Sequence, residues 1–372
     1  MIFVAIIAFI IILGLLIFVH ELGHFIVAKR AGMRVEEFGF GFPPRALSIK
    51  RGGTIYSINW IPLGGFVRIA GEDGGDANDP GLFTSKSGAA RLRVLLAGVV
   101  MNFLLGWLIL FFGFWAIGTP AEVGQGMAYA DKAIIKAQQT TIIAVLPNSP
   151  ALTAGFQAGD AILSVDGQTF AKIDDLIAYA TSHAGSPVTY QLKRGKQTLS
   201  ASVVPRTNPS ADEGAVGFVP AEIAIVKYPF FESASVATSS FVDKTGMIFT
   251  AFGQLLQKLV SSGKLVQGLS GPVGIAVLTK DFLGLGFAYL LQFVAILSIN
   301  LGVVNAFPFP ALDGGRVLFL AIEKIRGKRS MKWEQIANLV GFALLLLLMF
   351  AVTFRDVSHY SQQFKNLFNK IF

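Results

Sequence analysis

The chain begins with nineteen uncharged residues, Met1–Val19 (MIFVAIIAFIIILGLLIFV), and the next five are His20-Glu21-Leu22-Gly23-His24. Histidines four residues apart lie one above the other on a helix face, and Glu21 lies near that face. Neutral imidazoles suit zinc, and a nearby carboxylate can take a proton from a water that zinc holds. Ionisable groups beside so apolar a run are costly in hydrocarbon and need a functional reason. The pattern therefore predicts a zinc site inside a membrane, rather than two packed histidines with Glu21 reaching to the interface.

The composition indicates a membrane protein with several spans and a soluble insert. Hydrophobic residues make up 53% of the chain, charged residues only 15%, and there are 33 phenylalanines. An ordinary soluble domain of this size is less apolar. The chain has no cysteine, so any metal must be held by His, Asp or Glu.

Four stretches are long and apolar enough to cross a bilayer. They are Ile2–Ala28, Val94–Ile117, Leu283–Val304 and Ala337–Phe354. The first has no basic segment before it and carries the histidine motif where a signal peptide would be cleaved, so we expect it to be retained.

The net charge of +8 is distributed as membrane topology requires. Residues 29–93 hold ten Lys/Arg against six Asp/Glu, residues 314–336 hold six against two, and residues 118–284 hold twelve of each. Short basic loops stay on the cytoplasmic side, so the N-terminus and residues 118–284 should face outward. The same distribution argues against nucleic acid as a partner. His20 then lies in the inner half of the membrane, about 27 Å along the helix from Ile2.

The third apolar stretch ends in Asn305-Ala306-Phe307-Pro308-Phe309-Pro310-Ala311-Leu312-Asp313-Gly314-Gly315. Two prolines in three residues cannot continue a helix, so the chain should be broken here. Because this span runs inward like the first one, Asp313 should reach the depth of His20 and His24. Asp313 could simply form an Asp-Gly turn. The histidine pair still needs a third ligand and an open fourth position, which favours Asp313 as that ligand.

With these motifs the chain resembles the site-2 protease family of intramembrane zinc metalloproteases, most closely its bacterial RseP-like members. The segment 305–315 fits the family pattern Asn-x-x-Pro-x-Pro-x-Leu-Asp-Gly-Gly, and 39–43 and 271–276 look like accessory motifs. The resemblance implies one zinc ion held by His20, His24 and Asp313, with Glu21 as catalytic base. It also implies a substrate or oxyanion role for Asn305, which could otherwise only cap the broken helix.

Residues 47–60 read as a strand, a Gly52-Gly53 turn and a second strand. In members of the family this region forms a membrane-associated β-sheet beside the active site. An unpaired edge there could bind an unwound substrate segment by strand addition. A purely structural hairpin is the other interpretation.

Residues 127–206 read as a compact αβ module. Strands are expected at Thr141–Val145 and Ala161–Val165, and a helix is expected to begin at Ile173. The module resembles a bacterial PDZ domain, present once, whereas the best-known Gram-negative relative has two. Such a domain could bind a peptide terminus or exclude bulky substrates by its position.

Two further segments have helical apolar faces. Residues 240–262 and the C-terminal residues Phe364, Leu367, Phe368, Ile371 and Phe372 could lie on the bilayer surface. They could equally pack against the spans.

These observations predict a polytopic α-helical membrane protein with about four spans, a membrane-associated β-hairpin or sheet and an inserted extracytoplasmic PDZ-like domain. The expected divisions are 1–117, 118–220, 221–284 and 285–372. We expect a zinc endopeptidase of the bacterial inner membrane. By resemblance, it cleaves single-span proteins already cut by another protease, such as anti-sigma factors or remnant signal peptides. A membrane metal-handling protein and a catalytically idle PDZ adaptor are the alternatives; the intact Glu21 argues against the adaptor.

Overall fold

The computed structural model describes residues 2–72, 79–124, 127–195, 197–209, 213–262, 270–327 and 331–359. The chain forms two compact units. One comprises Met1–Ile109, Ser239–Lys280 and Phe293–Phe372, and the other comprises Leu110–Thr238 and Asp281–Gln292. Within these residues, four helices are long and apolar enough to cross a membrane, the same number that the sequence predicts.

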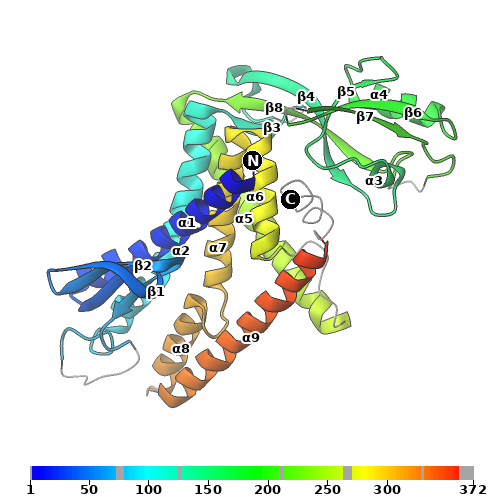
Figure 1. Ribbon diagram of the computed structural model, residues 1–372. Coiled ribbons are helices and arrows are strands. Elements are labelled where there is room, and N and C mark those ends of the chain that lie inside the picture. Colours follow the sequence, from blue (N-terminus) through cyan, green and yellow to red (C-terminus); the bar gives the residue numbers. More distant parts are fainter. Residues whose placement is uncertain are drawn as a thin grey trace. The chain divides into compact units, whose positions relative to one another are not determined.

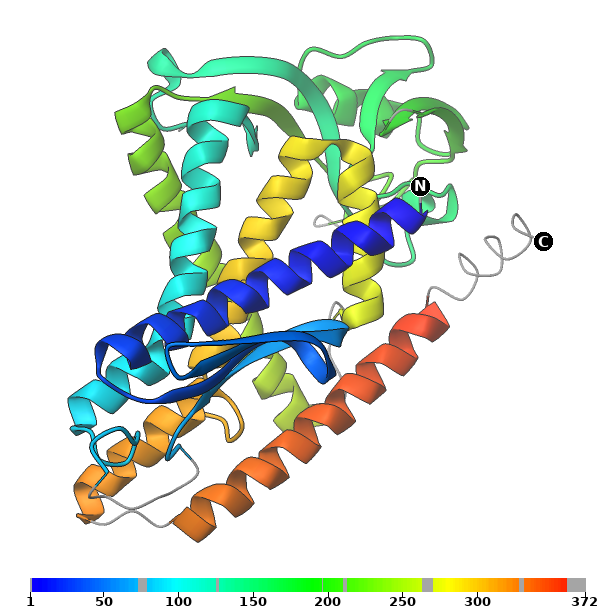
Figure 2. The same cartoon turned by 60° about the vertical axis from the view of Figure 1, so that its left-hand side comes forward.

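The membrane-length helices are α1 (Ile2–Arg30), α2 (Gly88–Phe112, continued by a π-helical turn at Gly113–Ile117), α7 (Phe287–Ala306) and α9 (Met331–His359). The predicted start of the third span at Leu283 is wrong by four residues. Residues 283–285 belong instead to α6 (Pro272–Leu285), and Gly286, with a φ of 122°, separates the two helices. Figures 1 and 2 show α1 running alongside α2.

The chain breaks after α7 as the two prolines require. Residues 307–312 are irregular, and the short helix α8 (Asp313–Arg326) begins at the predicted ligand. The start of α8 folds back tightly on this loop, because a Cβ on Gly315 would lie only 2.7 Å from the carbonyl carbon of Phe309. The glycines of the motif therefore allow the approach that places Asp313.

Two long strands, β1 (Val35–Arg51) and β2 (Thr54–Ile69), extend well beyond the predicted hairpin at 47–60. Both strands bend, so that residues 35–40 pair on one side with 65–69 and on the other side with 55–58. Residues 45–51 pair with 54–59. The two strands thus build four rows, and residues 65–69 form one outer edge.

The sheet is held against α1 by aromatic side chains. Phe38 packs on Phe18 and Phe25 of α1, with ring centroids 5.6 and 5.0 Å apart. Inside the sheet, the buried carboxylate of Glu37 accepts hydrogen bonds from Arg45 Nε at 2.9 Å and from Ser57 Oγ at 2.8 Å. These contacts fix the sheet beside the helix that carries the histidine motif (Figure 2).

Residues 240–262 belong to helix α5 (Phe230–Ser262). The sequence did not decide whether this segment lies on the bilayer surface or packs against the spans. Phe241 packs on Phe103 of α2 with ring centroids 5.7 Å apart, and Phe252 packs on Phe307 at 4.8 Å. This part of α5 therefore packs against α2 and against the loop that follows α7. The predicted C-terminal amphipathic segment, 364–372, lies outside the described residues.

Helices α6 and α9 are joined at one buried carboxylate. Asp356, near the end of α9, accepts hydrogen bonds from the amides of Gly271 and Gly274, both at 2.8 Å. Much of α9 otherwise exposes apolar side chains, including Leu339 at 69% and Phe354 at 79%. Such a surface is suited to lipid rather than water.

The second unit contains a six-stranded antiparallel sheet in the order β3-β8-β4-β5-β6-β7. Its strands are β3 (Thr119–Glu122), β4 (Ile134–Val145), β5 (Ala161–Val165), β6 (Val188–Arg194), β7 (Gln197–Val203) and β8 (Phe218–Lys227). The short helices α3 (Pro150–Thr153) and α4 (Ile173–Ser182) complete it. The strand at 161–165 and the helix start at Ile173 confirm the predictions, while the predicted strand 141–145 is the end of β4.

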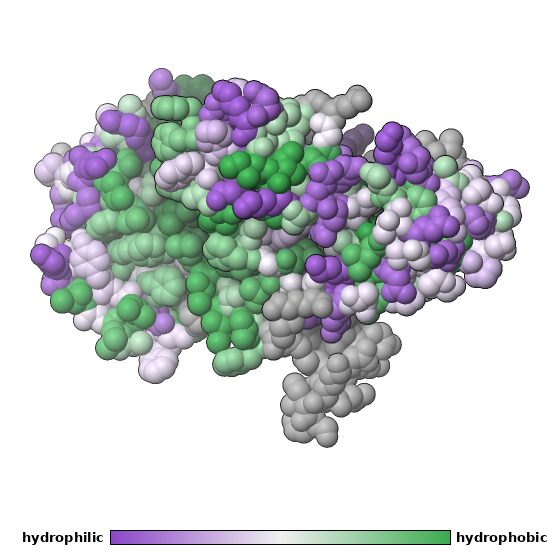
Figure 3. Space-filling view, turned by 90° about the horizontal axis from the view of Figure 1, so that it is seen from above, coloured by the Kyte–Doolittle hydropathy of each residue, from purple (hydrophilic) through white to green (hydrophobic). Residues whose placement is uncertain are grey.

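The core of this unit is built from alternating strand residues and one face of α4, including Ile142, Phe156, Val165, Leu176 and Tyr190. In the space-filling view, hydrophobic side chains gather into broad patches on the face seen, with hydrophilic side chains around them (Figure 3).

Candidate metal centre

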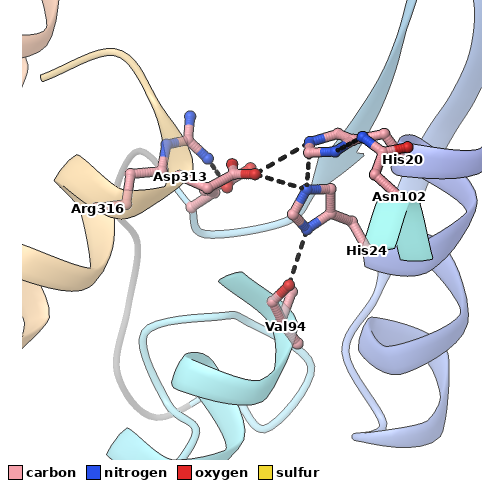
Figure 4. Close-up of polar contacts among 7 residues, drawn as sticks. His20, His24, Val94, Asn102, Asp313 and Arg316 are labelled. Atoms are coloured by element: carbon pink, nitrogen blue, oxygen red, sulfur yellow. Dashed lines mark hydrogen bonds and ion pairs between the residues drawn. The ribbon is translucent and has the colours of Figure 1, made fainter. Parts of the chain in front are cut away.

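Three side chains from the two ends of the chain converge in the first unit. His20 Nε2 lies 3.0 Å from Asp313 Oδ2, His24 Nε2 lies 3.3 Å from the same oxygen, and the two nitrogens are 3.2 Å apart. Both histidines are buried, and Asp313 is largely buried at the start of α8. Figure 4 shows the three groups pointing toward one another. The structure therefore brings together the three residues that the sequence singled out as ligands.

The spacing of these atoms suits a zinc ion. Ligand atoms about 2.0 Å from a tetrahedral zinc lie about 3.3 Å from each other, close to the three separations above. The carbonyl oxygen of Val94 lies 2.8 Å from His24 Nδ1, so this nitrogen carries the proton and Nε2 presents a lone pair. A carboxylate and an imidazole lone pair that face each other at this range repel each other unless a proton or a metal ion lies between them.

Helix α2 approaches the histidines closely at Gly98. A Cβ on this residue would lie 2.6 Å from His20 Cε1 and 2.7 Å from His20 Nε2. No side chain larger than hydrogen fits there without displacing the imidazoles. The close contact lets α2 present both the Val94 carbonyl and the side chain of Asn102 to the histidines (Figure 4).

Glu21 lies beside the convergence point, next to the outer edge of the β1–β2 sheet. Its Cγ would lie 3.4 Å from a Cβ on Gly65, the residue at which that edge begins. A cavity of about 220 Å³ opens here. Its walls include Glu21, His24, Phe66, Val67, Ile69, Glu72, Val94, Leu95, Ala311, Asp313 and Arg316. The cavity thus joins the catalytic candidates to the outer strand edge of the sheet.

Two ion pairs hold α8, and hence Asp313, in place. Arg316 pairs with Glu72, and Arg91 on α2 donates to both carboxylate oxygens of Glu323 at 3.0 and 2.6 Å. These four charged residues also line a second, small cavity of about 30 Å³, which shares Glu72, Leu95 and Arg316 with the larger one. Water can therefore be held close to the metal candidates by charged groups.

Asn305 is placed differently from the ligand residues. It lies half-buried in the last turn of α7, and within the described part of the chain its side chain makes no hydrogen bond to His20, His24 or Asp313.

The sequence did not single out Asn102, which contacts His20, or the pair Glu72–Arg316. Asn102 could have been noticed as the single carboxamide in the apolar stretch 94–117, because polar groups at membrane depth usually have a role.

Comparison with known proteins agrees with this geometry. The model of peptidase family M50 matches residues 8–348. Zinc metalloprotease RasP of Geobacillus kaustophilus is 31% identical over 96% of this chain and 98% of its own length. Regulator of sigma-W protease RasP of Bacillus subtilis is 30% identical (95% and 98%), and regulator of sigma-E protease RseP of Salmonella typhimurium is 31% identical (94% and 98%).

Among solved structures, the PDZ domain of the SdrC-like protein Lin2157 from Listeria innocua is 27% identical. It covers 22% of this chain and 92% of its own, with a TM-score of 0.20. The family match covers most of the chain. It includes both segments that form the metal centre, the histidine motif and the loop that leads to Asp313. The chain belongs to peptidase family M50, the site-2 protease family of intramembrane zinc metalloproteases.

Proposed function

We propose that His20, His24 and Asp313 hold the single zinc ion of this protease and that Glu21 is its general base. The convergence of the three ligand atoms within 3.0–3.3 Å of one another carries the proposal. A zinc ion held by these residues would supply Lewis acidity, which would lower the pKa of a water molecule and polarise the carbonyl of the scissile peptide bond. Glu21 then takes the proton of the attacking water and delivers it to the leaving amine.

The strand edge at 65–69 supports a way of presenting the substrate. A peptide bond inside a helix is shielded by its own hydrogen bonds, so a spanning substrate must unwind before it is cut. Among the described residues, 65–69 pair with β1 on one side and with no strand on the other, and Phe66, Val67 and Ile69 line the cavity that holds Glu21. We infer that an unwound segment adds to this edge as a further strand and is thereby held beside Glu21.

Asn305 is proposed to contact the substrate rather than the metal. Its place in the last turn of α7, half-buried and two residues before the irregular loop, keeps it near the loop that ends at Asp313. A carboxamide there can donate a hydrogen bond to a substrate carbonyl.

The charge distribution supports an orientation in the bacterial inner membrane. With the basic loops in the cytoplasm, the metal centre lies toward the cytoplasmic side and the αβ unit, a single PDZ-like domain at about 118–220, faces the periplasm. Residues 221–284 then connect that domain to the last two spans, 285–372. We expected this whole linker outside the membrane, but α5 packs along α2 and reaches Phe307, in the loop before Asp313, so this part of it lies beside the spans.

The substrate class follows from the relatives. Two of them are named regulators of sigma factors, sigma-W and sigma-E. We propose that this protease likewise cleaves single-span membrane proteins of the anti-sigma type, or remnant signal peptides, after a first cut outside the membrane. The PDZ-like domain would bind the new peptide terminus or exclude substrates that have not been cut.

Cleavage of a tagged single-span protein in proteoliposomes tests the assignment, with bound zinc measured in each preparation. Wild type should cleave and hold one zinc per chain. Glu21→Gln should hold zinc but lose cleavage by at least about 100-fold, the size of a general-base contribution. Asp313→Asn should lose zinc as well, because one of three protein ligands is weakened.

The outcomes separate the roles of these residues. A Glu21→Gln variant that still cleaves would remove Glu21 from the chemistry, and an Asp313→Asn variant with unchanged zinc would remove Asp313 from the ligand set. Zinc bound by wild type with no cleavage of any spanning substrate would point to metal handling or to an adaptor role.

A further inference from the structure

Resting on the ligand assignment above, we propose that Asn102 is a positioning residue for His20. Its side-chain amide oxygen accepts a hydrogen bond from His20 Nδ1–H and so keeps Nε2 directed at the metal. Asn102 lies in the middle of α2 and is fully buried, and its side-chain amide lies 3.0 Å from His20 Nδ1 (Figure 4).

The chemistry of the imidazole decides which amide atom faces it. A histidine that binds zinc through Nε2 carries its proton on Nδ1, so Nδ1 can only donate. With its nitrogen toward His20, Asn102 would offer a second donor, and its Oδ1 is then buried with no donor among the described residues. A half-turn of the carboxamide, whose two ends have nearly the same shape, brings the oxygen to Nδ1 and gives it the Nδ1 proton as a donor, and the amide nitrogen then takes the buried position that the oxygen held.

The other histidine supports this assignment by analogy within the same site. His24 Nδ1 lies 2.8 Å from the main-chain oxygen of Val94, which is an acceptor only. Both imidazoles are therefore held from α2 through Nδ1, one by a main-chain oxygen and one by Asn102. The backbone of Asn102 is itself anchored, because Ser298 on α7 donates to its carbonyl oxygen at 2.8 Å.

A structural role for Asn102 is the competing explanation. A buried carboxamide can simply join α1 to α2, since interhelical hydrogen bonds stabilise membrane helix bundles. That role predicts a change in the stability of the metal-free protein. The positioning role predicts a change in zinc affinity that depends on whether an acceptor is present at this position.

The test compares Asn102→Leu, Asn102→Ala and Asn102→Asp by zinc affinity, measured with a competing chelator on the full-length protein in detergent. Loss of the acceptor in the Leu and Ala variants should weaken zinc binding by about 10- to 100-fold. Asp restores an acceptor of the same size, so its affinity should stay within about threefold of wild type or rise. Asn300→Leu, the same change at an exposed position on α7, should leave the affinity unchanged.

Cobalt(II) provides a second reading of the same site, because its visible spectrum responds to the orientation of the ligands. The spectrum should shift in Asn102→Leu and return toward wild type in Asn102→Asp. Thermal unfolding of the metal-free proteins shows whether each variant folds. If the Leu and Ala variants do not fold, the zinc affinity and the cobalt spectrum of Asn102→Asp still test the proposal.

The proposal is overturned if Asn102→Leu folds and binds zinc like wild type, or if Asn102→Asp folds and binds as weakly as Asn102→Leu. Either result leaves the ligand assignment intact. Failure of that assignment looks different: wild type itself would bind no zinc, or Asp313→Asn would bind it normally.

Discussion

Gly98 sets how closely α2 can approach the histidines of α1. Gly98→Ala should weaken zinc binding at least about tenfold, because the new Cβ would lie 2.6–2.7 Å from the His20 ring and must displace it. Zinc affinity by chelator competition measures this. Gly246→Ala on α5 is the matched control, because a Cβ there meets no atom within 4 Å. Equal zinc affinity in Gly98→Ala and wild type would mean that the helices can separate without cost.

The sequence predicts the place of some residues at the metal centre better than that of others. His20, Glu21 and His24 are predictable because one helical turn relates them. Asp313 is predictable because two prolines stop the helix that precedes it. Asn102 contacts a histidine 82 positions earlier in the chain. Only the packing of α1 on α2 creates that contact, and a lone asparagine in an apolar stretch does not indicate its partner.

Among the elements, the β1–β2 sheet carries a pH-sensitive contact. Burial raises the pKa of Glu37, but the hydrogen bonds from Arg45 and Ser57 outweigh it and hold this pKa below the ordinary 4.5. A depressed folded-state pKa stabilises the fold at pH above 4.5, and this stabilisation is lost as the pH falls through and below that value.

Glu37→Gln should therefore lower the free energy of unfolding by about 1–3 kcal/mol at pH 7, because Arg45 and Ser57 lose a charged acceptor. The variant should also lose less stability than wild type between pH 7 and pH 4. Thermal unfolding at both pH values measures both effects. An identical loss in the two proteins would show that Glu37 is not the group that titrates.

The elements were predictable to different extents. The Gly52-Gly53 turn and its flanking strands are local features, and the structure contains them. The extension of both strands to residues 35 and 69 was not predicted, because residues 35–40 pair on both sides with segments that are distant in the sequence. The break at Gly286 was also missed, since residues 283–304 carry no charge and hydropathy alone does not mark a change of helix.

For the molecule as a whole, Asp356 is the contact that joins the last helix to α6. Asp356→Ala should destabilise the protein by about 1–3 kcal/mol and speed hydrogen exchange at Gly271 and Gly274, because two buried amides lose their acceptor. Thermal unfolding and exchange mass spectrometry measure the two effects. Val357→Ala, one residue on and half exposed, should change neither. Unaltered exchange at both glycines in Asp356→Ala would mean that α9 is held by other contacts.

At this scale hydropathy and charge were sufficient to predict four membrane helices and one inserted αβ unit. They could not show how α5 packs. Its sequence has an apolar face at helical spacing, as a surface helix would, and the contacts of Phe241 and Phe252 place it against α2 and the loop after α7.

The distance along the chain between the two halves of the metal centre also has a consequence in time. The histidines are made almost at once, whereas Asp313 follows nearly 300 residues later. At about 5–20 residues per second, synthesis leaves the histidines without their carboxylate for roughly 15–60 s. On the proposed ligand assignment, a nascent chain should therefore be unable to cleave a substrate until translation has passed Asp313.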